Sequence, residues 1–192
     1  MEFKISKLKY SYTINGIANI AIANKEQKYF LDDKLTIPLV FCSGDKNVDY
    51  WRKKSNISES DLNRVFGNSE SIEHYNKKME IANDLFFVDK VLNIKYKAAT
   101  SKTEHYIKSI NKIVDVAFFD KNGCLLICIE VFYTNKKTRE DIIKFNKENI
   151  IVYEYDIQQG TSYPISAGIS EQGIRGRISR GREFIQGITI EQ

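Results

Sequence analysis

IVDVAFFDKNGCLLICIEVFYTN, residues 113–135, consists of two apolar runs separated by a polar turn at Asn122-Gly123. Asn-Gly between two such runs predicts a β-hairpin, and the two residues suit the centre of a type I′ turn. Counting outward from that turn pairs Lys121 with Cys124, Phe119 with Leu126, Ala117 with Cys128 and Asp115 with Glu130. The only two acids inside the strands, Asp115 and Glu130, are therefore expected to be direct cross-strand neighbours.

Two carboxylates in these positions repel each other. Directly opposed residues on one face of a sheet have Cβ atoms about 4.5–5.5 Å apart, and like charges there destabilise the pairing. A divalent cation would offset the repulsion, and hard oxygen ligands suit Mg²⁺ or Mn²⁺. Three alternatives stay open: one carboxyl is protonated, a lysine forms a salt bridge with it, or a three-residue loop changes the parity and separates the pair.

Composition predicts a soluble globular protein of one domain, with or without a small appendage, since 42% of its 192 residues are hydrophobic and 28% are charged. We expect neither export nor a membrane partner, because the chain lacks a signal peptide and any run of about 18 apolar residues. Three cysteines, an odd number, suit reduced thiols in a cytoplasmic protein. A net charge of +4 is compatible with a nucleic-acid partner and is also common in proteins that never bind DNA. Homo-oligomerisation is left open.

Residues 1–54 are predicted to be a β-rich N-terminal part, with a tight turn at Asn15-Gly16. The part ends in an aromatic and cationic cluster, which we interpret as a candidate nucleic-acid-binding segment: Trp51, Arg52, Lys53 and Lys54. The alternative is a half-buried tryptophan with cationic side chains that extend to solvent. Residues 55–68 are expected to be a connection that contains a short helix at 59–66.

A helix is predicted over about residues 69–86, with apolar residues at spacings of three and four. They indicate a face packed against a sheet: Ile72, Tyr75, Met79, Ala82 and Phe86. A polar stripe lies roughly opposite and by itself is a solvated face: Glu70, Glu73, His74 and Lys77.

The segments around the hairpin alternate between strand and helix patterns. Residues 91–98 predict a half-buried strand, and 99–108 predict a polar connection with His105 in an exposed loop. Residues 136–149 predict an amphipathic helix capped by Thr134 or Asn135, and 150–157 predict a strand. A right-handed crossover makes this strand parallel to the Glu130 strand. Residues 69–157 thus form an α/β (α+β) core of helix, three-stranded antiparallel meander, helix and strand.

Residues 158–192 are rich in glycine and arginine. One reading is a flexible arm that binds phosphates through Arg175, Arg177, Arg180 and Arg182. The other is a set of short strands, because isoleucines recur along the segment.

This order of elements, with an acid on the second strand and another on the third, resembles the PD-(D/E)XK nuclease core, and within it the competence-protein, CoiA-like branch. The matching pieces are Val40 to Cys42, Tyr50 to Lys54, Ser69-Glu70-Ser71-Ile72-Glu73-His74 with Lys77, Val114 to Ala117, and Ile129 to Val131. The resemblance implies a magnesium-dependent deoxyribonuclease, a hydrolase that binds single-stranded, duplex or branched DNA. It assigns the metal, Mg²⁺ or Mn²⁺, to Asp115 and Glu130, and further catalytic roles to Glu70, Glu73 and Lys77.

Two departures from the family pattern bear on these roles. Phe132 stands two residues after Glu130, where the superfamily has lysine or glutamine, so another cation must substitute or the site is inactive. The nearest candidates are Lys77, Lys136 and Lys137. Cys42 is the only cysteine of the N-terminal part, and we expect no structural zinc because such a site needs about four ligands. Three functions therefore compete: a nuclease, a degenerate member that binds nucleic acid or protein without cutting, and a structural protein.

Overall fold

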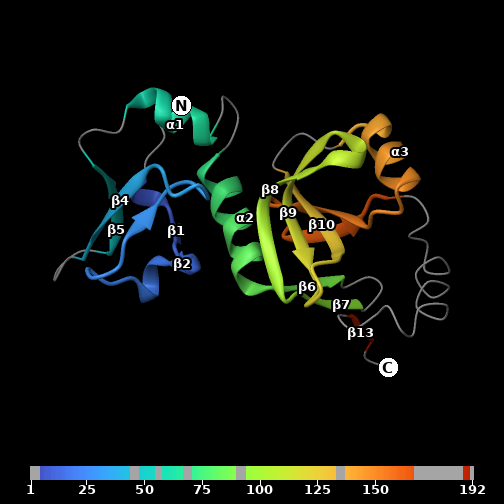
Figure 1. The fold of residues 1–192 in the computed structure, drawn as a ribbon, viewed down its shortest axis with the longest axis horizontal. Helices are drawn as coiled ribbons and strands as arrows, with labels where there is room; N and C mark the ends of the chain where they lie inside the picture. The colour runs from blue at the N-terminus through green and yellow to red at the C-terminus, as the bar shows by residue number, and fades with distance from the viewer. Residues whose placement is uncertain are drawn as a thin grey trace. The chain divides into compact units, whose positions relative to one another are not determined.

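The computed structural model describes residues 5–43, 48–54, 58–66, 71–89, 94–132, 137–166 and the backbone of 188–190. It divides into two compact units, Met1–Asn83 and Asp84–Gln192, and is a mixed α/β structure with few helices (Figure 1). Glu70, Lys136, Arg175, Arg177, Arg180 and Arg182, together with the predicted caps Thr134 and Asn135, lie outside the described residues.

The N-terminal unit is built on a five-stranded sheet in the order β2-β1-β3-β4-β5. Its strands are β1 (Tyr10–Thr13), β2 (Gly16–Asn19), β3 (Tyr29–Phe30), β4 (Pro38–Cys42) and β5 (Tyr50–Lys53). A tight turn joins β1 to β2, where Thr13 pairs with Gly16 and Gly16 takes a positive φ of 119°. Asp32 holds the turn before β4, because one carboxylate oxygen accepts the backbone N–H groups of Thr36 and Ile37, each at 2.8 Å.

Helices complete this unit: α1 (Glu59–Phe66), α2 (Ile72–Asp84) and the 3₁₀ turns η1 (Ile5–Lys7) and η2 (Ile20–Ile22). The predicted apolar stripe of α2 is buried at Tyr75, Met79 and Ala82, and Tyr75 and Met79 belong to the core of the N-terminal unit. The Tyr75 hydroxyl donates to the Leu31 carbonyl at 3.2 Å. The predicted end at Phe86 is wrong: the helix ends at Asp84, and Phe86 begins a strand.

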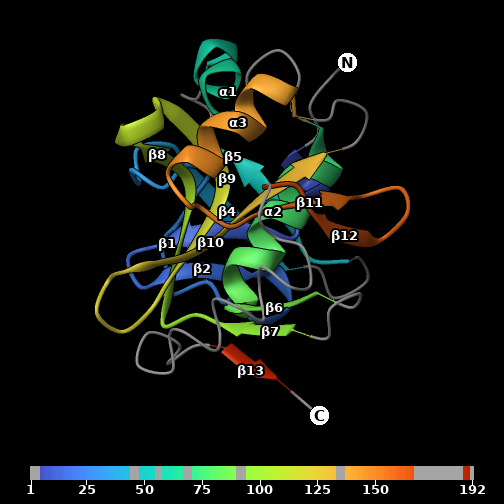
Figure 2. The same cartoon turned by 90° about the vertical axis from the view of Figure 1, so that its right-hand side faces the viewer.

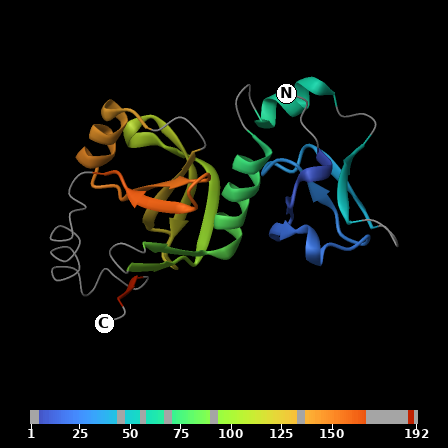
Figure 3. The same cartoon turned by 180° about the vertical axis from the view of Figure 1, so that it is seen from behind.

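The C-terminal unit has a main sheet in the order β12-β11-β10-β9-β8 (Figure 3). Its strands are β8 (Thr100–Ile107), β9 (Lys112–Phe119), β10 (Leu125–Phe132), β11 (Val152–Asp156) and β12 (Thr161–Pro164), with η3 (Lys108–Ile110) between β8 and β9. Strands β8, β9 and β10 form an antiparallel meander. The chain then passes through α3 (Arg139–Lys147) and returns as β11, which is parallel to β10 as predicted.

The first strand of the meander is not the predicted one. Residues 99–108, expected to be a connection, contain β8, and His105 lies on this strand rather than in a loop. The segment was misread because β8 is an edge strand, buries Thr103 and Ile107 only, and is otherwise polar. The strand expected at 91–98 is β7 (Ile94–Lys97), which pairs with β6 (Phe86–Asp89) and β13 (Ile188–Ile190) in a separate sheet.

The hairpin turn also differs from the prediction, although its effect on register is small. Phe119 pairs with Leu125 instead of Leu126, and a bulge between Leu125 and Ile127 restores the predicted pairing of Ala117 with Cys128. Asp120 closes the turn, since its carboxylate accepts the backbone N–H groups of Asn122 and Cys124, each at 2.8 Å. A longer turn and a bulge together therefore preserve the parity of the two strands.

The two faces of the main sheet are covered by different elements. On one face α3 buries Phe145 beside Ala117, Cys128 and Val152. Its N-cap is Thr138, whose hydroxyl accepts the Asp141 N–H at 3.3 Å. On the other face the ring of Tyr153 lies 5.0 Å from that of Phe87 on β6. Figure 2 shows α3 and the β6–β7 hairpin on opposite sides of the unit.

Candidate functional site

Three carboxylates form a row across adjacent strands of the main sheet: Asp115 on β9, Glu130 on β10 and Glu154 on β11. Glu130 and Glu154 are direct partners in the parallel register. The antiparallel register runs through Val116 and Ile129, so the next pair outward is Asp115 and Glu130. Since paired residues point to the same face, the whole row lies on the face that α3 covers. The predicted acid pair is thus brought together, and Glu154 joins it.

Glu130 and Glu154 are equally buried, each 3% exposed, but Glu130 is less fully hydrogen-bonded. The Oε1 of Glu130 has no hydrogen-bond partner among the described residues. Its Oε2 lies 3.1 Å from the ammonium nitrogen of Lys137. Asp115, half-buried beside it, accepts the backbone N–H of Val131 at 2.8 Å. A buried carboxylate oxygen without a donor is costly, so the site favours a proton or a cation at this position.

Both carboxylate oxygens of Glu154 accept hydrogen bonds, in contrast to those of Glu130. Its Oε1 accepts the backbone N–H of Lys137 at 2.6 Å, and its Oε2 accepts the hydroxyl of Tyr163 at 2.9 Å. Tyr163 lies directly opposite Glu154 on β12. Lys137 therefore contacts two carboxylates, through its side chain to Glu130 and its backbone to Glu154, and it anchors the start of α3 to the row.

Burial and mutual repulsion shape the ionisation of the site. Burial, and then the negative charge of Asp115, raise the pKa of Glu130 to about 8, and the ammonium of Lys137 opposes them only in part. Burial by itself lowers the pKa of Lys137, but the carboxylates of Glu130, Asp115 and Asp141 outweigh it and raise that pKa overall. At neutral pH the site thus holds a proton that a bound cation would displace.

Among the described residues, no group of three or more side chains is arranged to hold a metal ion. Asp115 and Glu130 are the two neighbouring carboxylates of the row that could contribute ligands to one. Mg²⁺ is usually bound by one or two carboxylates and keeps several waters, and the unpartnered Oε1 of Glu130 is an available oxygen ligand.

The other predicted catalytic residues that the structure describes belong to the N-terminal unit. Glu73 and Lys77 are on α2 in the N-terminal unit, where Glu73 is exposed and Lys77 forms an ion pair with Glu80 at 2.7 Å. Phe132 is buried on β10, and its ring lies 6.2 Å from that of Tyr163 on β12. The side chain of Phe132 thus makes an apolar contact, and Lys137 is the cation among the described residues whose ammonium lies beside Glu130.

In the aromatic and cationic cluster at residues 51–54, the tryptophan is buried and the three cations are exposed. Trp51 is 1% exposed and packs with its ring 4.6 Å from Tyr29, so its indole offers no open face to a nucleobase. Arg52, Lys53 and Lys54 are exposed. The sequence left open an indole that stacks on bases or a half-buried one, and Trp51 is more buried than both interpretations expect.

Sequence reasoning did not single out Glu154 or Tyr163. Glu154 interrupts the apolar strand at 150–157, and a buried acid opposite Glu130 follows once the parallel register is known. That register depends on the length of the crossover through α3, which the local sequence pattern does not specify. No sequence pattern indicated a role for Tyr163, because its contact with Glu154 depends on the pairing of β12 with β11.

None of the described helices is both long enough and apolar enough to cross a membrane. Comparison with known proteins gives no match to a family model, to a curated protein or to a solved structure.

Proposed function

We propose that the protein is a metal-dependent nuclease that hydrolyses DNA phosphodiester bonds at the row of Asp115, Glu130 and Lys137. The observation that carries the proposal is the buried Glu130 carboxylate, which has one unpartnered oxygen, an acid beside it and an ammonium 3.1 Å away. Perturbed carboxylates that converge with a cation are typical of functional sites. The sheet supports the proposal, because an antiparallel meander followed by a crossover helix and a parallel strand is the order expected of a PD-(D/E)XK core.

Each residue has a distinct task in this proposal. Asp115 and Glu130 would hold Mg²⁺ or Mn²⁺, which when bound lowers the pKa of water and stabilises developing negative charge. Lys137 supplies positive charge beside the acids, the part that the family's lysine plays and that Phe132 cannot. Glu154 and Tyr163 act as positioning residues, because they hold the backbone at Lys137 and thereby keep its ammonium near Glu130.

The test is cleavage of single-stranded, duplex and branched DNA by the full chain with Mg²⁺ or Mn²⁺. Cleavage should require the metal and fall at least about 100-fold in Asp115→Asn and in Glu130→Gln, since each removes a metal ligand. Glu140→Gln, an exposed acid in the first turn of α3, is the matched control and should keep full activity. The proposal fails if no substrate is cut, or if Asp115→Asn cuts as fast as the unaltered chain.

A second function, binding of nucleic acid or protein without cleavage, is favoured by one observation. Phe132 is buried against Tyr163 in place of a lysine, as expected of a fold that has lost its chemistry. Calorimetric titration with Mn²⁺ separates the two functions. Binding that disappears in Glu130→Gln supports the nuclease, whereas no binding supports the degenerate module.

A further inference from the structure

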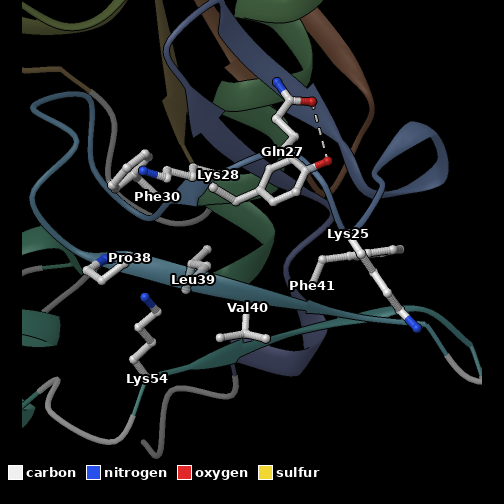
Figure 4. A pocket seen from close by; sticks show the side chains of 10 residues that line it. Lys25, Gln27, Lys28, Phe30, Pro38, Leu39, Val40, Phe41 and Lys54 are labelled. Atoms are coloured by element: carbon white, nitrogen blue, oxygen red, sulfur yellow. Dashed lines mark hydrogen bonds between the residues drawn. The ribbon is translucent and has the colours of Figure 1, made fainter.

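The N-terminal unit contains a cavity of about 570 Å³ that the acid row does not use. It lies along β3 and β4, and none of the ten described residues that line it is acidic (Figure 4): Lys25, Gln27, Lys28, Tyr29, Phe30, Pro38, Leu39, Val40, Phe41 and Lys54. Cavities that bind small ligands measure roughly 300–1,000 Å³, so its volume suits a ligand of that class.

The floor of the cavity is apolar and aromatic. Phe30 and Phe41 are half-buried and contribute to its lining. The register pairs Phe30 with Pro38, so these two side chains and Val40 share one face of the sheet. Phe41 is on the other face, where its ring lies 5.5 Å from that of the buried Trp51. A planar aromatic ligand could therefore pack on Phe30 beside Pro38 and Val40.

The rim of the cavity is cationic. Lys25, Lys28 and Lys54 are exposed, and Figure 4 shows Lys25 and Lys54 at opposite ends. Arg52 pairs with Val40 in the sheet and so projects on the same face as this lining residue. Positive charge at both ends suits a ligand whose negative charges are spaced along a chain, and a single compact anion would use only one end.

We propose that this cavity binds single-stranded nucleic acid, with a base packed on Phe30 and the flanking phosphates paired with Lys25, Lys28 and Lys54. Single-strand binding sites combine a positively charged groove with aromatic side chains in this way. The site goes beyond the proposed cleavage, because it is in the other unit and needs no metal. It also changes the part played by β5: Trp51 packs in the core on the opposite face of the sheet, and Phe30 meets the base.

The cationic rim is tested by binding of a fluorescein-labelled oligothymidylate to the full chain in EDTA. The triple variant Lys25→Glu, Lys28→Glu and Lys54→Glu reverses the charge of the rim and should weaken binding at least tenfold. It should also reduce the slope of log Kd against log salt concentration by about 2, since each phosphate contact on a single strand contributes about 0.7 to that slope. The matched control reverses three exposed lysines of the same unit that do not line the cavity, Lys7, Lys9 and Lys34. It should retain most of the affinity.

The aromatic floor is tested by Phe30→Ala, with Ile22→Ala, an exposed apolar residue of the same unit, as the control. Phe30→Ala should weaken binding about tenfold with little change in the salt slope, because loss of stacking removes no charge. Thermal melting of each variant verifies the fold. Unchanged binding in both cavity variants, equal loss in the controls, or a rim effect seen only on anionic phospholipid vesicles would overturn the proposal. Cavity-dependent binding by a chain that never cleaves DNA supports this site and contradicts the nuclease.

Discussion

Lys137 places its ammonium nitrogen 3.1 Å from Oε2 of Glu130, across the junction between β10 and α3. The same residue donates its backbone N–H to Glu154, so the start of α3 and the acid row are held by one residue. Because Glu130 is buried with Asp115 beside it, this ammonium offsets part of the repulsion predicted from the sequence. Of the alternatives considered for the acid pair, the lysine contact is present, and the raised pKa of Glu130 favours the protonated carboxyl.

Replacement of Lys137 should reveal how strongly it is coupled to Glu130. Lys137→Met leaves the buried carboxyl without its cation, and we expect a loss of unfolding free energy of about 1–3 kcal/mol at pH 8, where breaking one side of such a pair is costly. The double variant with Glu130→Gln should lose less than the sum of the single changes. Urea unfolding of the four proteins measures this. Additive losses would show that the two residues are not coupled, and Lys144→Met, exposed on α3, controls for the lost side chain.

Stability should fall as the pH rises toward 8. The pKa of Glu130 is raised from 4.5 to about 8 in the folded protein. Between these values the folded state therefore holds a proton that the unfolded state has lost. The stabilisation is fully present below about pH 4.5 and is lost as the pH rises through about 8. The slope is at most about 1.4 kcal/mol per pH unit.

Glu130→Gln removes this titration. The variant should show a flatter dependence of unfolding free energy on pH and should be more stable than the unaltered chain at pH 9, because glutamine carries no charge to bury. Urea unfolding at several pH values measures the slope, with Glu140→Gln as the exposed control. An unchanged slope in Glu130→Gln would show that another group titrates.

Metal affinity should rise with pH over the same range. A cation at Asp115 and Glu130 must displace the proton on Glu130, so Mn²⁺ affinity is expected to increase up to about tenfold per pH unit below pH 8. Calorimetry in two buffers of different ionisation enthalpy would detect about one proton released per ion. Binding that is independent of pH, or that persists in Glu130→Gln, would place the ion elsewhere.

A buried hydrogen-bond network joins the two sheets of the C-terminal unit. The Tyr153 hydroxyl donates to Asp89 at 3.0 Å and lies 3.0 Å from the hydroxyl of Tyr96. Tyr153→Phe should cost about 1–3 kcal/mol, because it removes a buried donor from a carboxylate. The matched control is Tyr106→Phe, because the exposed hydroxyl of Tyr106 donates to Asn111 at 3.0 Å and should contribute little. Equal losses in thermal or urea unfolding would contradict the assignment.

Much of the hairpin was predictable because its information is local. Alternation with a period of two and the Asn-Gly turn place Asp115 opposite Glu130, and the longer turn at Asp120 does not alter this because a bulge restores the parity. The parallel return of β11 was predictable from the spacing of strand, helix and strand. Strand β8 was missed because an edge strand with one exposed face looks like a polar connection.

The sequence by itself determined the acid pair and the elements that carry it, since strand periodicity and turn chemistry act over a few residues. Only the tertiary structure decided what surrounds the pair. The register across the α3 crossover brings Glu154 into the row, and the start of α3 brings Lys137 to Glu130. Likewise, packing within the N-terminal unit buries Trp51 and leaves Phe30 and Phe41 along the cavity. These contacts join residues far apart in the chain, and no local pattern encodes them.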